Sequence, residues 1–182
     1  MKPIVIDNIF SEQELYFLYQ QVINSPVWSI SGSSYDPTYP SKNIFLGAPQ
    51  FIVKKDDNGA ISNYPMYIYG QSIVYRIAKI LKQKKIGMQT NLVRMWFNIT
   101  YSNSSSHHLH QDDSENNTQS ILLFLTPIWN TEWAGSFYIA GEQFKFKPGN
   151  AIVFDSRDYH MGESPTDSTF TWHRLTCNIK VK

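Results

Sequence analysis

The sequence has little cysteine, little excess charge and no long apolar run, and each shortage excludes a class of protein. Cys177 is the only cysteine, so no internal disulfide can form and a reducing compartment is allowed. Lys and Arg number 16 against 15 Asp and Glu, which leaves a formal net charge of +1 and no basic surplus for a phosphate backbone. No stretch approaches the roughly 18 apolar residues of a membrane span. We therefore expect a cytoplasmic protein that binds neither nucleic acid nor a membrane.

Length and composition predict a single globular domain over residues 1–182. A chain of this size with 42% hydrophobic residues can bury a full core. Its start, MKPIVIDNIF, has a short apolar run and an early Asp7, so it does not predict a signal peptide.

The first half of the chain carries two helical patterns. Ser11 and Glu14 have the spacing of a capping box, and the apolar residues behind them recur at helical intervals for about three turns. Pro65 suits the first turn of a second helix, which we expect to close at Gly87. Between the helices, Ser29–Ser62 is rich in Ser, Gly, Pro, Tyr and Asn, and our hypothesis is that it forms a lid or binding loop.

From about residue 89 the pattern changes to short β-rich runs, which turn residues such as KPGN separate. Helices followed by strands are typical of an α+β fold. We expect a helical part over about residues 1–88, packed on one face of an antiparallel barrel over about residues 89–182.

The stretch SSSHHLHQDD places three histidines and two aspartates within seven residues. His110 and Asp112 are two residues apart, so at a strand end both side chains point to one face and can reach one ion. Such a pair alone is weak evidence for a metal site, because it occurs often by chance. His160 strengthens it, since it follows the apolar run AIVF and can face the same barrel mouth. Two imidazoles and one carboxylate form the facial triad of non-haem Fe(II) oxygenases, which leaves positions open for a co-substrate and O2.

The last β-rich run, FTWHRLTCNIKV, contains an arginine. Strand alternation puts Trp172, Arg174 and Thr176 on one face, and His173 on the other with the apolar residues. A guanidinium inside a barrel is costly without an anion, and its planar fork matches a carboxylate. The sequence therefore predicts an anionic ligand beside Arg174.

Five motifs occur in the order of one known family: IVIDNIFSEQEL, TYSNSSSHHLHQDD, FLTPIWNTEWAGSFYI, FKFKPGNAIVFDSRDYHMGES and HRLT. Over about residues 4–180 the chain resembles the Fe(II)/2-oxoglutarate-dependent dioxygenases, in their prolyl 4-hydroxylase-like branch. The resemblance implies a double-stranded β-helix, a jelly-roll barrel of the cupin type, with N-terminal helices packed on one sheet.

The resemblance also implies roles for individual residues. The implied iron ligands are His110, Asp112 and His160. Arg174 would bind the distal carboxylate of 2-oxoglutarate with help from Thr176, and Tyr101 would contact co-substrate or substrate in the same pocket. The implied reaction is hydroxylation by O2, coupled to decarboxylation of 2-oxoglutarate to succinate and CO2, with ascorbate as a candidate reductant.

Three positions depart from the family pattern. Phe124 stands where many relatives have a tyrosine that bonds the co-substrate, so that hydrogen bond is either missing or supplied by another group. Ala134 replaces the first glycine of a Gly-Gly pair. The interval between His160 and Arg174 is a few residues longer than usual, which we expect a turn in SPTDST to absorb.

The substrate is less well defined by the sequence. A prolyl residue in a protein or peptide is the leading expectation, and a small metabolite stays open. Two other functions also stay open: a cupin-like barrel that binds a metal or small ligand without oxygenase activity, and an inactive family member used for binding. The candidate substrate contacts are His107, Trp172, Arg157 and Tyr159. We expect His108 and Asp113 to be solvated loop residues and His173 to be structural.

Overall fold

The computed structural model of the chain describes residues 1–24, 29–30, 46–47, 53–55, 59–101, 109–114, 117–166 and 173–182. The predicted lid, Ser29–Ser62, lies mostly outside the described residues, and His107, His108 and Trp172 lie wholly outside them. No helix within these ranges is long and apolar enough to cross a membrane.

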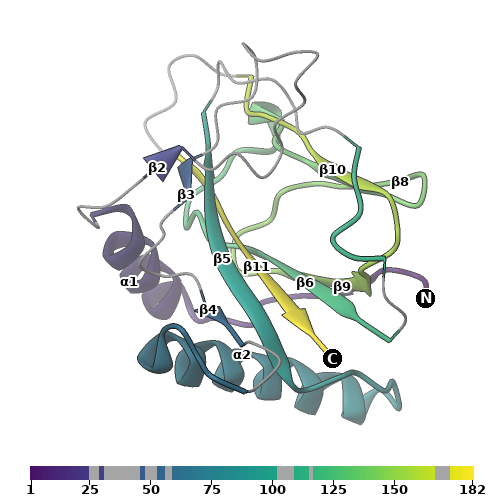
Figure 1. Cartoon of the computed structure of the whole chain (residues 1–182). Coiled ribbons are helices and arrows are strands. Elements are labelled where there is room, and N and C mark those ends of the chain that lie inside the picture. Colours follow the sequence, from purple (N-terminus) through teal and green to yellow (C-terminus); the bar gives the residue numbers. More distant parts are fainter. Residues whose placement is uncertain are drawn as a thin grey trace.

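Helix α1 (Glu12–Ile23) forms where the sequence predicts it (Figure 1). The predicted capping box is confirmed: Glu14 N donates to Ser11 Oγ at 3.2 Å, and Ser11 N donates to Glu14 Oε2 at 2.9 Å. These two bonds satisfy amides that the first turn of a helix leaves without partners. The buried face of α1 consists of Leu15, Leu18, Tyr19 and Val22.

Helix α2 (Tyr64–Gln83) has a proline in its first turn, as predicted, but it ends earlier than expected. The residue in the left-handed conformation is Lys85, with φ +60°, not Gly87. Ile86 N donates to Leu81 O at 3.0 Å, which closes the helix with a six-to-one bond. Glycine adopts positive φ without strain, but here the left-handed residue lies two positions before the glycine, and a lysine accepts the conformation.

The β-rich half forms two antiparallel sheets, as the α+β prediction requires. The strand order of the large sheet is β1 (Ile4–Ile6), β9 (Ala151–Asp155), β6 (Gln119–Phe124), β11 (Arg174–Val181), β5 (Leu92–Thr100), β3 (Leu46–Gly47) and β2 (Ser29–Ile30), with β4 (Val53–Lys54) also paired to β5. The order of the small sheet is β10 (His160–Gly162), β7 (Phe137–Ile139) and β8 (Glu142–Phe144).

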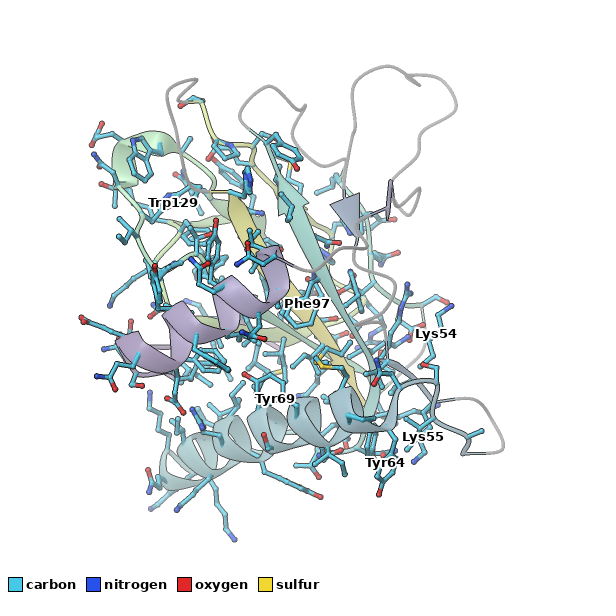
Figure 2. All side chains as sticks on the ribbon, turned by 90° about the vertical axis from the view of Figure 1, so that its left-hand side faces the viewer. Lys54, Lys55, Tyr64, Tyr69, Phe97 and Trp129 are labelled. Atoms are coloured by element: carbon cyan, nitrogen blue, oxygen red, sulfur yellow. The ribbon has the colours of Figure 1, made fainter. Side chains whose placement is uncertain are left out.

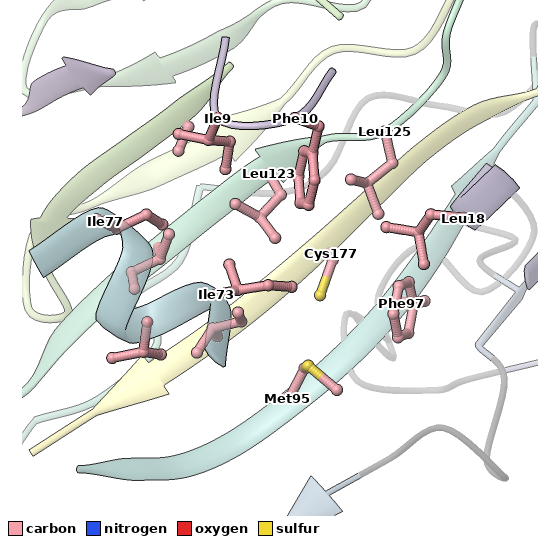
Figure 3. Close-up of a cluster of buried hydrophobic side chains, with 14 of the residues drawn as sticks. Ile9, Phe10, Leu18, Ile73, Ile77, Met95, Phe97, Leu123, Leu125 and Cys177 are labelled. Carbon is pink, nitrogen blue, oxygen red and sulfur yellow. The ribbon is translucent and has the colours of Figure 1, made fainter. Parts of the chain in front are cut away.

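Both helices cover one face of the large sheet, and the small sheet lies across its other face (Figures 1 and 2). Between helices and sheet, Ile73 and Ile77 of α2 and Leu18 of α1 pack against Phe97 and Cys177 (Figure 3). Burial raises the pKa of the Cys177 thiol, so it stays neutral in this core. The predicted packing of the N-terminal helices on one sheet is confirmed, and it leaves the opposite face of the sheet free to form a pocket.

Candidate active site

A polar pocket lies between the two sheets, and alternation along β11 decides which side chains reach it. Leu175, Cys177 and Ile179 belong to the core under the helices. Arg174 and Thr176 point the other way and line the pocket, as strand alternation predicts. The small sheet closes the pocket with residues of β7 and β10.

His110, Asp112 and His160 come together at this pocket. One potential ligand atom from each lies within 4.8 Å of the other two. The distance to Asp112 Oδ1 is 3.5 Å from His160 Nε2 and 4.0 Å from His110 Nε2. The local fold explains this, because His110 and His160 exchange two backbone hydrogen bonds, of 3.0 and 2.9 Å, in an antiparallel bridge. Two imidazoles and one carboxylate are the donor set that suits Fe(II) with open coordination positions.

Neighbouring polar groups orient these three side chains. Ser120 Oγ donates to Asp112 Oδ2 at 2.6 Å and lies 2.9 Å from Ser156 Oγ. His160 Nδ1 lies 2.8 Å from the carbonyl oxygen of Asp158 and donates to it, so Nε2, which lies 3.5 Å from Asp112 Oδ1, is the nitrogen available to a metal. Ser120 lies outside the five quoted motifs and Ser156 lies inside one of them, and the sequence assigned a role to neither.

Asp112 is almost fully buried, yet its carboxyl group stays ionised. Burial acts to raise its pKa, but the hydrogen bond and charge of His160, the hydrogen bond from Ser120 and the charge of His110 together lower it. A carboxylate held in the charged form is ready to coordinate a cation without first losing a proton.

Arg174 is 1% exposed and lies at the start of β11. Its Nε donates to the carbonyl oxygen of Gly135 at 2.9 Å, and its Cζ lies 5.6 Å from the ring centre of Phe146. Burial lowers the pKa of this guanidinium to about 10, against a smaller opposing effect of Glu163, so it is charged at neutral pH. Among the described residues no carboxylate forms an ion pair with Arg174. A buried guanidinium in this state calls for an anionic ligand.

Tyr101, which was predicted to contact co-substrate or substrate, is not among the side chains that line this pocket. Its ring packs edge-on against His173, with ring centroids 5.0 Å apart, and contacts the core under the helices. Thr100, which pairs directly with Arg174 across β5 and β11, occupies the pocket-side parity instead. His173 faces away from Arg174, as predicted, and burial lowers its pKa.

The structure does not bring Arg157 or Tyr159 to the pocket. Arg157 forms a two-pronged pair with Asp155, with Nε–Oδ1 and Nη2–Oδ2 distances of 2.9 and 2.7 Å. Arg157 holds the pKa of Asp155 at about 2 through these contacts. Tyr159 is 58% exposed and does not line the pocket.

Two of the departures from the family pattern are visible in the structure. Phe124 is buried between the sheets, where its ring stacks on Phe146 at 4.6 Å and lies beside Thr176 across the strand pair. Ala134 has φ +58° and is followed by Gly135 with φ +78°. The first of these conformations strains an alanine, whereas glycine adopts it freely. The turn that was expected to absorb the longer interval before Arg174, in SPTDST, lies half outside the described residues, from position 167 on.

Two further polar side chains near the triad were misjudged or missed. Asp113 was expected to be solvated, but its side chain is only 12% exposed and forms an ion pair with Lys180 of β11. Arg94 of β5 lines the pocket and was not noticed in the sequence. Its signal was present, because Arg94, Trp96 and Asn98 alternate with buried apolar residues in LVRMWFNIT.

Comparisons with known proteins agree with this fold. No family model matches the chain, and no curated protein matches its sequence. A prolyl-4-hydroxylase of Pseudomonas putida matches with a TM-score of 0.66 at 12% identity, over 99% of this chain and 92% of that one. A Trichoplax adhaerens prolyl hydroxylase, solved with a peptide fragment of the hypoxia inducible factor oxygen degradation domain, has a TM-score of 0.63 at 15% identity, over 98% and 82%. The carbocyclase SnoK from nogalamycin biosynthesis has a TM-score of 0.65 at 11% identity, over 99% and 79%. The chain therefore has the double-stranded β-helix fold of the Fe(II)/2-oxoglutarate oxygenases, in the form that prolyl hydroxylases share.

Proposed function

We propose that this chain is an Fe(II)- and 2-oxoglutarate-dependent dioxygenase that acts as a hydroxylase, with residues 1–182 as one catalytic domain. One observation carries the proposal. His110, Asp112 and His160 offer ligand atoms within 4.8 Å of one another in a pocket that also contains the buried Arg174, which forms no ion pair with a carboxylate of the described residues. A metal triad and a carboxylate-binding guanidinium in one cavity are what this chemistry requires.

Each side chain then has a defined task. His110, Asp112 and His160 would hold Fe(II), which when bound supplies the activation of O2. Ser120 keeps the Asp112 carboxylate in place through the bond at 2.6 Å.

Arg174 and Thr176 would bind the distal carboxylate of 2-oxoglutarate. The Arg174 guanidinium already has its Nε bonded to Gly135 O, so its orientation is fixed before the co-substrate arrives. Thr176 lies two residues further on the same face of β11 and is 2% exposed. With Phe124 lacking a hydroxyl, Thr176 is the neighbouring group that can supply the additional hydrogen bond.

A prolyl residue in a protein or peptide is our first candidate substrate. The resemblance in the sequence motifs supports it, as do the prolyl hydroxylases among the structural neighbours. A small molecule is the second candidate, because the similar fold of SnoK belongs to a carbocyclase of an antibiotic pathway. Ascorbate is the proposed reductant, and a reducing cytoplasm suits both Fe(II) and the lone Cys177.

The test is Fe(II)-dependent conversion of 2-oxoglutarate to succinate by the purified chain. We expect turnover in the wild type and its loss in His110→Ala and in Arg174→Ala, the first through metal affinity and the second through co-substrate affinity. Equal turnover in the three proteins would contradict the proposal. Retained Fe(II) binding with no affinity for 2-oxoglutarate, measured by calorimetry, would favour a cupin-like binding protein instead.

A further inference from the structure

The pocket contains a second guanidinium that the proposed chemistry does not use. Arg94 of β5 lines the pocket, and its Cζ lies 4.6 Å from the ring centre of Trp96. Among the described residues, its buried Nε has no hydrogen-bond partner and no carboxylate pairs with the side chain. A buried donor without a partner in a functional cavity is a candidate ligand contact.

Strand register places Arg94 at the metal end of the pocket. Arg94 pairs with Lys180 of β11, and Lys180 pairs with Ser120 of β6, so the three residues form one line across the sheet. Ser120 is the residue that bonds Asp112. Arg174 lies six residues from Lys180 along β11, so the backbone positions of Arg94 and Arg174 are roughly 20 Å apart along the strands, while both side chains line the same pocket as the metal triad.

The charges of the pocket leave Arg94 without a counter-ion. Lys180, its neighbour on β11, is neutralised by Asp113. With the proposed ligands bound, Asp112 and the two carboxylates of 2-oxoglutarate balance the metal ion and Arg174. The positive charge of Arg94 then remains, and a single negative charge on the substrate complements it.

We propose that Arg94 binds a carboxylate group of the substrate and so selects substrates that carry this group close to the carbon that is hydroxylated. This inference rests on the proposed function and concerns the same pocket. Arg94 lies in register with Ser120, which bonds the proposed metal ligand Asp112, and not beside Arg174, which would bind the co-substrate. This position assigns Arg94 to the substrate.

Neighbouring side chains hold the Arg94 guanidinium ready for such a group. Asn98, with its amide oriented to satisfy its neighbours, accepts hydrogen bonds from Trp96 Nε1 at 3.3 Å and from Asn178 Nδ2 at 3.0 Å. The indole ring is thereby fixed and provides a flat surface against Arg94. Stacking on a ring face leaves the N–H edges of a guanidinium free, and these edges match a carboxylate in two-pronged geometry.

The experiment measures binding without turnover. Wild type, Arg94→Gln and Arg94→Lys are loaded anaerobically with Fe(II) and 2-oxoglutarate and titrated calorimetrically with small carboxylic acids, each paired with its primary amide. N-acetyl-L-proline and N-acetyl-L-prolinamide form the prolyl pair. Peptides that end in a free or an amidated C-terminal proline distinguish a peptide carboxylate from a small acid. Arg76→Gln, the same change on α2 across the large sheet from the pocket, is the control.

We expect the wild type and Arg76→Gln to bind at least one acid about tenfold or more tightly than its amide, as a charged hydrogen bond allows. Arg94→Gln should lose this preference with unchanged affinity for 2-oxoglutarate, and Arg94→Lys should retain part of it because the charge remains without the fork. The inference is overturned if no acid binds ahead of its amide, if the preference survives in Arg94→Gln, or if Arg94→Gln loses 2-oxoglutarate instead. Succinate formation without an acid preference would defeat this inference alone, whereas an acid preference without any succinate formation would defeat the proposed function alone.

Discussion

The carbonyl oxygen of Gly135 accepts a hydrogen bond of 2.9 Å from Arg174 Nε, and it does so from a backbone conformation that favours glycine. Gly135 has φ +78°, and a Cβ atom there would lie 2.6 Å from Trp129 Cζ2 and 3.3 Å from Arg174 Cδ. Trp129 cannot retreat freely, because its Nε1 donates to Ala134 O at 3.1 Å. The turn at Gly135 therefore determines where the guanidinium lies.

Gly135→Ala should weaken 2-oxoglutarate binding. The new methyl group displaces Trp129 and Arg174, and loss of a well-placed charged hydrogen bond is worth about 1.5–3 kcal/mol, or about tenfold or more in affinity. The measurement is calorimetric titration of the Fe(II)-loaded protein with 2-oxoglutarate.

Gly141→Ala is the matched control for that change. Gly141 also has φ +78°, but nothing lies within 4 Å of a Cβ placed there. Both variants carry the same backbone strain of about 1–2 kcal/mol, and only Gly135→Ala carries the collision. Equal 2-oxoglutarate affinity in the two variants would show that Gly135 does not position Arg174.

Ser120→Ala should weaken Fe(II) binding. Ser120 Oγ donates to Asp112 Oδ2 at 2.6 Å, and removing such a partner of a metal ligand typically costs about 10- to 100-fold in metal affinity. A competitive chelator titration measures this affinity. Ser72→Ala on α2, where the hydroxyl bonds only Tyr69 O, should leave it unchanged. Wild-type metal affinity in Ser120→Ala would mean that Asp112 is held by its backbone alone.

Local rules predicted those parts of the molecule that local chemistry determines. The capping box of Ser11 and Glu14 and the alternation of Arg174 and Thr176 along β11 depend only on residues within one element, and both are confirmed. The α+β architecture followed from the change of pattern near residue 89. The convergence of His110 and His160 needed the family resemblance, because residues fifty positions apart share no local signal.

The errors occurred where the answer depended on tertiary contacts. Asp113 lies in a polar stretch of the sequence, which is typical of a solvated loop. Lys180 comes close to it through the pairing of β11 with β6, which the local sequence does not reveal. Tyr101 follows β5 by one residue, so a shift of a single position moved it from the pocket face to the core face. The role of Ser120 is visible only in the folded structure, where its hydroxyl group bonds the Asp112 carboxylate.

Lys180→Met should destabilise the protein more than removal of an exposed ion pair does. The side chains of Lys180 and Asp113 are 19% and 12% exposed, so the change removes the cation that pairs with a carboxylate in a largely buried position. We expect a loss below the about 3–5 kcal/mol of a fully buried pair, measured by urea unfolding of the metal-free protein.

The double variant Lys180→Met/Asp113→Asn should recover part of this loss, because the uncompensated charge is gone. Lys147→Met is the exposed control: Lys147 and Asp7 are each 58% exposed, and their pair should contribute about 1 kcal/mol or less. Equal losses for Lys180→Met and Lys147→Met would contradict a buried ion pair beside the metal site.

His173 should make the unfolding free energy depend on pH on the acid side of neutrality. Burial against Tyr101 lowers the pKa of His173 below its ordinary value of about 6.5, so the unfolded chain binds this proton more readily than the folded one. Stability from this residue is present above the unfolded pKa and is lost as pH falls below it, because protons then favour the unfolded state. The measure is the difference between the urea-unfolding profiles of wild type and His173→Gln from pH 8 to pH 5, at about half-unit steps, because this difference isolates the contribution of His173. The free energy of unfolding of His173→Gln should decrease less steeply than that of the wild type as the pH falls. Parallel profiles would show that the imidazole is as easily protonated in the folded state as in the unfolded chain.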